Sequence, residues 1–229
     1  MTVMIEMVSD LVCPWCWLGL RRLQGAIAEV QGEFDVDVHY RPFQLDPTVP
    51  PEGMPYKEYM TAKFGGLGDG EKAESKDRFS QMRTLLEEYG EAEGIPFKFS
   101  GIEVRPNTLD AHRLVRWAQG QSKGWAAKEV LFNAYFNEHK DIGDKDVLCD
   151  VAEKIGLDRA LVADLLSGQA DIQNVLQEEV AFRQLGIGGV PTYIANRKVA
   201  AQGAEDVHKL VRFLRTAAKE HPLEPAQAD

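Results

Sequence analysis

Cysteine is scarce in this chain, with three residues among 229. Small secreted domains that are held together by disulfides use more cysteines, normally in even numbers. The first residues also lack the pattern of a secretory signal peptide, because no basic segment is followed there by a long apolar run. We therefore expect a cytoplasmic protein in which two neighbouring cysteines are redox-active or bind a metal, with the third cysteine left over.

Long apolar runs and an excess of basic residues are missing as well. No stretch of about 18 apolar residues occurs, so we expect no membrane span. The net charge of −10 argues against a nucleic-acid-binding protein, which usually carries a basic balance or patch. The hydrophobic content of 44% and the charged content of 27% are typical of a globular protein, and 229 residues suffice for one or two domains.

The two neighbouring cysteines belong to the motif Cys13-Pro14-Trp15-Cys16. Apolar residues on both faces predict a central strand over Val3–Val8, and helical spacing predicts a helix over Pro14–Gln31. A structural zinc site needs four ligands, and Cys149 is the only other cysteine. We therefore favour a redox pair and expect that neither a metal nor an organic cofactor is required.

The start of this helix predicts different roles for the two cysteines. Cys13 stands at the N-cap, where unpaired N–H groups and the helix dipole favour a thiolate, the attacking species in disulfide exchange. Cys16 lies one turn later on the apolar face, and greater burial suits a thiol that resolves a mixed disulfide at Cys13. Pro14 and Trp15 fix the helix start and offer an aromatic surface to a substrate.

The remaining chain predicts one more strand, a long helical block, and a closing hairpin and helix. Phe34–Arg41 alternates between apolar and polar residues and predicts a strand near a sheet edge, reached by a parallel crossover. A hairpin is predicted over 192–200 and a final helix over 205–218. The helices expected between these parts span 56–64, 71–90, 108–120, 124–138, 145–155, 158–167 and 171–185.

This order of elements predicts an α/β fold in which a helical domain interrupts one sheet. The two ends of the chain, 1–43 and 186–221, would form the α/β domain. Residues 44–185 would form the insert, and the polar tail 222–229 is expected to be disordered.

A second chemical feature is Gly189-Val190-Pro191-Thr192, far from the cysteines in sequence. Proline cannot donate a ladder hydrogen bond, so Pro191 is expected at the head of a strand. Together with the upstream cysteine pair, this position predicts a cis Val190–Pro191 bond that presents the Val190 main chain beside the sulfur atoms. An extended substrate peptide can pair with such a main chain as an added strand.

In this order the motifs resemble the DsbA-like thioredoxin-fold oxidoreductases, and more specifically their FrnE subfamily of dithiol–disulfide isomerases. The stretches that carry the resemblance are Ser9–Cys16, Phe43–Pro47, Asn107–Arg113 and Gly189–Ala204. The resemblance implies a thioredoxin fold with a large inserted all-helical domain. It also implies a thiol–disulfide oxidoreductase or isomerase with the redox pair at Cys13 and Cys16 and the cis-proline at Pro191.

Two alternatives remain open at this point. The same superfamily includes glutathione-dependent 2-hydroxychromene-2-carboxylate isomerases and kappa-class glutathione transferases, which act on small aromatic compounds and typically carry serine at the position of Cys13. The resemblance therefore leaves glutathione as a possible co-substrate beside Val190, with Gly203 and Ala204 at the last helix start offering N–H groups to its carboxylate. The other alternative is a binding or chaperone-like module with a redox-sensing dithiol.

Several weaker predictions complete the site. Gln44 and Asn107 are candidate polar substrate contacts, although a loop-bracing amide and a helix cap explain them equally well. Cys149 is expected to be a small buried hydrophobic residue, and Glu6 to keep its carboxylate in water at the margin of the sheet. The expected partners are disulfide- or thiol-containing proteins or glutathione; the sequence leaves open a monomer or a homodimer, and the direction of electron flow.

Overall fold

The computed structural model describes residues 1–64 and 69–223, with side chains given outside 64–79. Residues 65–68, which lie between the predicted helices 56–64 and 71–90, and residues 224–229 of the predicted disordered tail lie outside the described residues. The chain divides into two compact units: a sheet unit, Met1–Phe43 with Leu176–Asp229, and a helical unit, Gln44–Val175.

The sheet unit contains a four-stranded sheet in the order β2-β1-β5-β6. Its strands are β1 (Thr2–Ser9), β2 (Asp35–Pro42), β5 (Thr192–Ala195) and β6 (Val199–Gln202). β1 pairs in parallel with β2 and antiparallel with β5, and β5 and β6 form an antiparallel hairpin. The predicted parallel crossover and the predicted hairpin are therefore confirmed, and β1 is a central strand.

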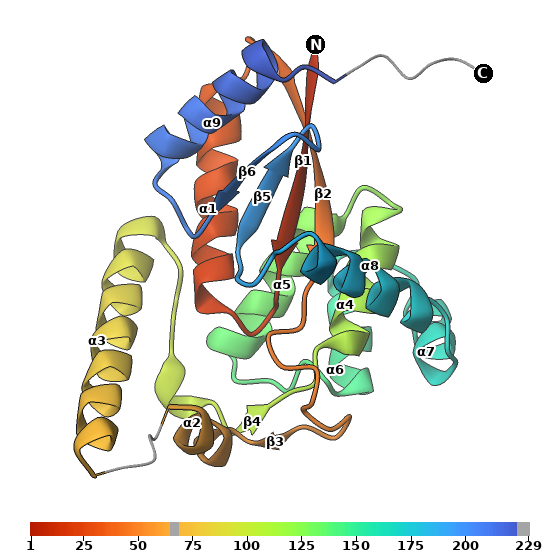
Figure 1. The fold of residues 1–229 in the computed structure, drawn as a ribbon. Coiled ribbons are helices and arrows are strands. Elements are labelled where there is room, and N and C mark those ends of the chain that lie inside the picture. The colour runs from red at the N-terminus through yellow and green to blue at the C-terminus, as the bar shows by residue number, and fades with distance from the viewer. Residues whose placement is uncertain (65–68, 224–229) are drawn as a thin grey trace. The chain divides into compact units, whose positions relative to one another are not determined.

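Two helices of the sheet unit, α1 (Pro14–Glu29) and α9 (Val207–Glu220), lie side by side on one face of the sheet (Figure 1). Both bury one apolar face, as the spacing of their hydrophobic residues requires. The buried set comprises Leu18, Leu20, Leu23, Leu210, Val211 and Leu214. This packing holds the first turn of α1, and with it both cysteines of the motif, in a fixed position at the end of β1.

Glu6 in the middle of β1 departs from expectation. Its side chain is buried, with 8% of the residue exposed. Its Oε1 accepts a hydrogen bond from Arg41 Nε at 2.9 Å and forms an ion pair with Arg41 Nη2 at 2.8 Å. Arg41 also reaches Glu178 Oε1 at 3.3 Å. The prediction that the Glu6 carboxylate lies in water is therefore wrong, because the neighbouring strand β2 supplies a guanidinium that compensates its burial.

The helical unit consists mainly of α2 to α7, and its helices fall close to the predicted ranges. They are α2 (Tyr56–Phe64), α3 (Asp69–Glu93), α4 (Leu109–Gln119), α5 (Gly124–Phe136), α6 (Lys145–Lys154) and α7 (Arg159–Ser167), with a single 3₁₀ turn at Phe99–Gly101. Asp144 and Asp158 cap α6 and α7 through side-chain hydrogen bonds, as their sequence positions predict.

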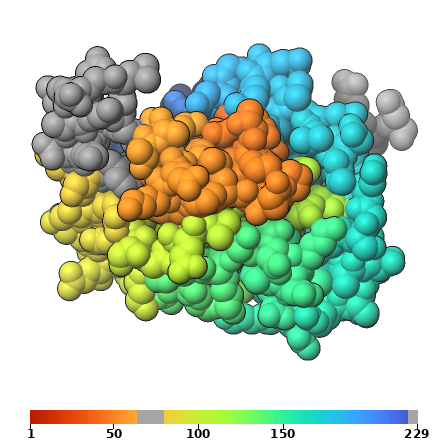
Figure 2. Space-filling model, turned by 90° about the horizontal axis from the view of Figure 1, so that it is seen from below, coloured from red at the N-terminus to blue at the C-terminus, as the bar shows by residue number. Residues whose placement is uncertain are grey.

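One feature corrects the expectation of an all-helical insert. β3 (Met54–Pro55) and β4 (Val104–Arg105) form a two-stranded antiparallel ribbon. In the space-filling view of Figure 2, the orange segment that contains β3 lies against the yellow-green segment that contains β4. Strands of two residues are too short to show any periodicity, so sequence reasoning had no signal for them.

Helix α8 (Ile172–Gln184) crosses the boundary between the units and shifts it from the predicted position. The boundary falls at Leu176 rather than after residue 185. The reason is packing: Phe182 joins Val8 and Phe43 in a buried apolar cluster of the sheet unit. Most of α8 thus belongs with the strands.

Among the described residues, no helix is both long enough and apolar enough to cross a membrane.

Candidate active site

The dithiol stands at the first turn of α1. Cys13 is the N-cap residue, with extended backbone angles (φ −96°, ψ 110°), and Pro14 occupies the first helical position. The Cys13 carbonyl accepts the Cys16 N–H at 3.0 Å, and the Asp10 carbonyl accepts the Cys13 N–H at 3.3 Å. This geometry places the Cys13 sulfur near the positive end of the helix dipole.

The two cysteines differ in burial, and they are not joined in a disulfide. Cys13 retains 4% exposure, whereas Cys16 is 0% exposed on the inner face of α1. Trp15 and Pro14 between them are half-buried. The more accessible sulfur is thus the one at the helix end.

A loop from the far end of the chain meets the Cys13 sulfur. The Cys13 thiol donates to the Val190 carbonyl oxygen at 3.7 Å, across 177 residues of sequence. The Val190–Pro191 peptide bond is cis. The Thr192 hydroxyl donates to the Gly189 carbonyl at 2.8 Å, and the Gly203 N–H donates to the Pro191 carbonyl at 2.8 Å, so both sides of the loop are anchored.

Tyr193, which sequence reasoning missed, lies within this site. It follows Pro191 by two residues on β5 and is 0% exposed. Its hydroxyl lies against Gly19, so that a Cβ atom at Gly19 would collide with it. The available signals were a glycine in the interior of a helix, three residues after Cys16, and a polar aromatic residue on the strand that Pro191 begins.

Burial raises the pKa of the Tyr193 phenol well above its usual value, and the neighbouring Cys16 and Cys13 sulfurs raise it further. The Arg22 side chain acts in the opposite direction with a smaller effect. The phenol is therefore protonated throughout the neutral range, and its O–H is a hydrogen-bond donor.

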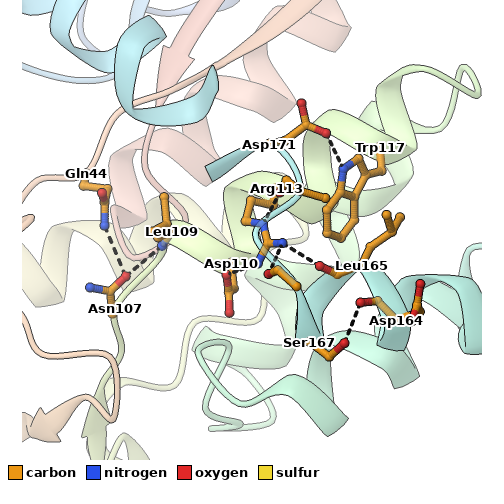
Figure 3. Close-up of polar contacts among 12 residues, drawn as sticks. Gln44, Asn107, Leu109, Asp110, Arg113, Trp117, Asp164, Leu165, Ser167 and Asp171 are labelled. Carbon is orange, nitrogen blue, oxygen red and sulfur yellow. Dashed lines mark hydrogen bonds and ion pairs between the residues drawn. The ribbon is translucent and has the colours of Figure 1, made fainter. Parts of the chain in front are cut away.

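Gln44 and Asn107 belong to the helical unit, where they contact each other. Gln44 Nε2 donates to Asn107 Oδ1 at 3.3 Å, and the same oxygen accepts the Leu109 N–H at 2.9 Å at the start of α4 (Figure 3). Asn107 Nδ2 donates to the Val49 carbonyl at 2.7 Å. These bonds are those of a loop brace and a helix-start turn, and substrate contact by either residue remains a prediction.

Arg113 organises a second polar cluster in the helical unit (Figure 3). It is 1% exposed and donates to three backbone carbonyls that follow or end α7: Leu165, Gly168 and Ala170, at 2.6, 3.0 and 2.7 Å. Its Nη1 also pairs with Asp110 at 2.7 Å. These partners all lie within the helical unit, so the guanidinium stabilises the end of α7.

The last helix starts later than predicted, and this affects the site predicted at Gly203 and Ala204 for the carboxylate of glutathione. α9 begins at Val207 rather than at 205, and the Asp206 side chain accepts the Lys209 N–H at 2.9 Å. The Ala204 carbonyl accepts a hydrogen bond from Arg22 at 2.7 Å. The helix N-terminus is thus already capped by a carboxylate of this chain.

Metal-ligating residues do not gather in the described part of the chain: no group of three or more histidine, cysteine or acidic side chains is placed to hold an ion. Cys149 is 3% exposed in α6, and burial raises the pKa of its thiol. It is therefore a buried, protonated cysteine, as its sequence context predicts.

A four-stranded mixed sheet, a dithiol at the start of the first helix and a facing cis-proline define a thioredoxin-type domain, here interrupted by a mainly helical insertion. The model of the DSBA-like thioredoxin domain family matches residues 4–215, and the chain belongs to that family. The predicted fold class and the resemblance to DsbA-like proteins are confirmed.

Relatives of known sequence or structure agree with this assignment. The uncharacterized protein YwbO of Bacillus subtilis is 30% identical over 200 residues, which cover 85% of this chain and 87% of YwbO. The crystal structure of a probable DsbA oxidoreductase from Streptomyces coelicolor is similar with a TM-score of 0.84 and 26% identity, over 99% of this chain and 94% of that one.

Two more distant structures share the fold. A 2-hydroxychromene-2-carboxylate isomerase has a TM-score of 0.68 and 18% identity, with 97% of this chain and 100% of the isomerase covered. The cytosolic disulfide reductase DsbM from Pseudomonas aeruginosa, in its structure with GSH, has a TM-score of 0.60 and 20% identity, with 94% and 99% covered.

Proposed function

We propose that this protein is a thiol–disulfide oxidoreductase or isomerase with Cys13 as nucleophile and Cys16 as resolving thiol. The observation that carries the proposal is the position of the Cys13 sulfur, at a helix N-terminus and 3.7 Å from the Val190 carbonyl oxygen. Membership of the DSBA-like family supports the same chemistry. The helix end favours the thiolate, which is the species that attacks a disulfide.

The reaction follows from the two positions. The Cys13 thiolate attacks a substrate disulfide, forms a mixed disulfide and releases one substrate thiolate. Cys16 then loses its proton to solvent and attacks Cys13, which frees the second substrate thiolate and leaves a Cys13–Cys16 disulfide. Two electrons pass to the substrate; run backwards, the same steps oxidise a substrate dithiol.

Substrate binding is proposed at the Val190–Pro191 loop. Val190 is half-buried beside the Cys13 sulfur, and its main chain offers an extended peptide a partner for strand pairing. Pro14 and Trp15 flank the sulfur on the helix side. A protein or peptide disulfide is the proposed substrate, with side-chain contacts by Gln44 and Asn107 as a further proposal.

Glutathione is proposed as the small thiol partner in a cytoplasmic protein of the FrnE type. The DsbM structure with GSH supports it by analogy of fold. The glutathione carboxylate would need a partner other than the start of α9, because Asp206 occupies that position.

The test is disulfide exchange measured with an insulin-reduction assay and a scrambled-substrate assay. Cys13→Ser should abolish exchange, because no attacking thiolate remains, and Cys16→Ser should accumulate mixed disulfides at Cys13. Cys149→Ser serves as the matched control and should retain activity, since that thiol lies in the helical unit, buried and protonated. Full exchange activity in Cys13→Ser would refute the mechanism.

The second candidate is a glutathione-dependent isomerase or transferase for a small aromatic compound. The whole-length fold shared with a 2-hydroxychromene-2-carboxylate isomerase supports it. Cys16 has no role in such a reaction. Turnover of an aromatic substrate that is unchanged in Cys16→Ser would favour this candidate over disulfide exchange.

A further inference from the structure

Tyr193 carries a polar atom that the fold leaves without a hydrogen-bond partner. Its hydroxyl oxygen is buried, and within the described residues it has no hydrogen bond. Buried O–H groups are normally paired, because water no longer solvates them. A phenylalanine would fill the same space without this cost, so packing alone does not explain the hydroxyl.

The position of the hydroxyl connects it to the dithiol. It contacts α1 at Gly19, and Pro191 Cγ would lie 3.0 Å from a Cβ atom at the same glycine. Residues three apart in a helix are neighbours on one face, so Cys16 lies one turn from this contact. The tyrosine ring thus reaches across from β5 to the inner face of α1, beside the fully buried cysteine.

The titratable groups that act on the phenol are Cys16 and Cys13 at the start of α1, Arg22 nearly two turns further along the same helix, and Glu205 before α9. Arg22 donates to the Ala204 carbonyl at 2.7 Å, so its guanidinium already has a partner in that loop. Among these groups, only the cysteine sulfurs gain a negative charge during disulfide exchange.

We propose that the Tyr193 hydroxyl donates a hydrogen bond to the Cys16 sulfur when that sulfur becomes a thiolate. This inference rests on the proposed function. In the resolving step the Cys13 sulfur is bound to the substrate, so Cys16 is the sulfur that carries the charge. A donor already placed in a dry site stabilises that charge without having to be drawn from water.

The step is balanced as follows. The Cys16 S–H bond breaks and its proton leaves to solvent; the Cys16 sulfur then bonds to Cys13, and the bond between Cys13 and the substrate sulfur breaks. The substrate leaves as a thiolate and takes up a proton. Tyr193 keeps its own proton throughout. In the reverse direction Cys16 is the leaving thiolate, so the same hydrogen bond assists it.

The experiment is stopped-flow reaction of the reduced protein with glutathione disulfide, which separates attack by Cys13 from resolution by Cys16. In Tyr193→Phe the second phase should slow by about ten- to a hundredfold, the range for a hydrogen bond to a charged group. Its pH–rate midpoint should move to higher pH. The first phase and the thermal stability should be retained, because only an unpaired hydroxyl is removed.

Tyr135→Phe is the matched control, since Tyr135 is also buried, at 2% exposure, but lies on α5 in the helical unit. It should leave both phases unchanged. A second phase in Tyr193→Phe with wild-type rate and pH midpoint would overturn the inference while leaving the proposed function intact. Exchange that survives in Cys13→Ser would instead overturn the proposed function.

A second measurement covers the case in which Tyr193→Phe does not fold. In the Tyr135→Phe protein, the remaining tyrosines are replaced by 3-fluorotyrosine. The O–H group at position 193 then becomes a stronger hydrogen-bond donor, while the side chain keeps almost the same shape. The second phase should then accelerate while the first phase stays the same. An unchanged second phase in this protein would also overturn the inference.

Discussion

At the scale of single residues, the proposed disulfide exchange depends on the different positions of two similar side chains. Cys13 and Cys16 are three positions apart, yet Cys13 caps the start of the helix whereas Cys16 lies on its buried face. Helical periodicity alone predicts this difference, since one turn moves the second sulfur onto the apolar face. The same reasoning from sequence could not assign Gln44 and Asn107, because their partners are a main-chain carbonyl and each other.

Asp46 provides a test of electrostatics at this scale. Burial opposes its ionisation, but hydrogen bonds from Thr48 and Lys63 outweigh burial and lower its pKa from 3.8 to about 2. The Thr48 hydroxyl donates at 2.6 Å and Lys63 Nζ at 3.2 Å. Because the pKa is lower in the folded state, these contacts stabilise the protein above about pH 4, and the stabilisation is lost as the pH falls from 3.8 towards 2.

We therefore expect Asp46→Asn to lower the free energy of unfolding at pH 7 by roughly 0.5–1 kcal/mol, the scale of a partly exposed pair. The difference from the wild type should vanish near pH 2. Urea denaturation across this pH range measures it, and Thr48→Val should show a part of the same dependence. A difference that does not change with pH would contradict this account.

At the scale of elements, α1 depends on a close approach to β5. Gly19 lies in the interior of the helix, where a glycine is normally unfavourable by about 1 kcal/mol relative to alanine. Here the Tyr193 hydroxyl and Pro191 occupy the space that a Cβ atom would need. Sequence propensity predicts this helix correctly but does not explain why position 19 is a glycine. The close packing of β5 against the helix explains it.

Gly19→Ala should therefore destabilise the protein by about 1–3 kcal/mol, the usual cost of overpacking, despite the better helix propensity of alanine. Gly25→Ala in the same helix is the control, because its Cβ would approach only the Val207 side chain, with Cγ2 at 3.2 Å and Cγ1 at 3.6 Å. Its effect should stay within about 0.5 kcal/mol of neutral. Chemical denaturation of the two variants compares them directly. Equal destabilisation by both would mean that the contact with Tyr193 is not the cause.

The assignment of α8 shows the limit of sequence reasoning for an element. Its helical character was predictable within a residue at each end. The unit to which the helix belongs was not predictable, because the decisive contact joins residues that are far apart in the chain. In that contact Phe182 packs against Val8 and Phe43. Which residues of such a helix are buried depends on the surface against which the helix packs.

At the scale of the whole molecule, the sheet unit is assembled from both ends of the chain. Asn196, in the β5–β6 turn, joins three of its parts and is 3% exposed. Its Oδ1 accepts the Met4 N–H at 2.8 Å, and its Nδ2 donates to the His221 and Ala217 carbonyls at 2.8 and 3.4 Å. The side chain thus ties β1 and the end of α9 to the hairpin.

Asn196→Ala should lower the free energy of unfolding by roughly 2–4 kcal/mol, because buried main-chain groups lose their partners. Arg197→Ala is the matched control: it has a similar positive φ, 57° against 50°, and an exposed side chain. Its effect should stay below about 1 kcal/mol. Similar losses in the two variants, measured by urea denaturation, would show that turn geometry rather than the hydrogen bonds is responsible.

The sequence by itself determined the elements of this protein and the position of its cysteine pair. Periodicity and capping residues specify nearly every helix and strand, because both act over a few neighbouring positions. The same local rules place Cys13 at a helix start and Cys16 on its buried face.

Only the tertiary structure decided which residues pack against these elements and pair with them. It paired Glu6 with Arg41 and gave α8 to the sheet unit. It also placed the unpaired hydroxyl of Tyr193 beside the inner face of α1. The physical reason is that burial and hydrogen-bond partnership are properties of surfaces that come together across the chain, and no local pattern records them.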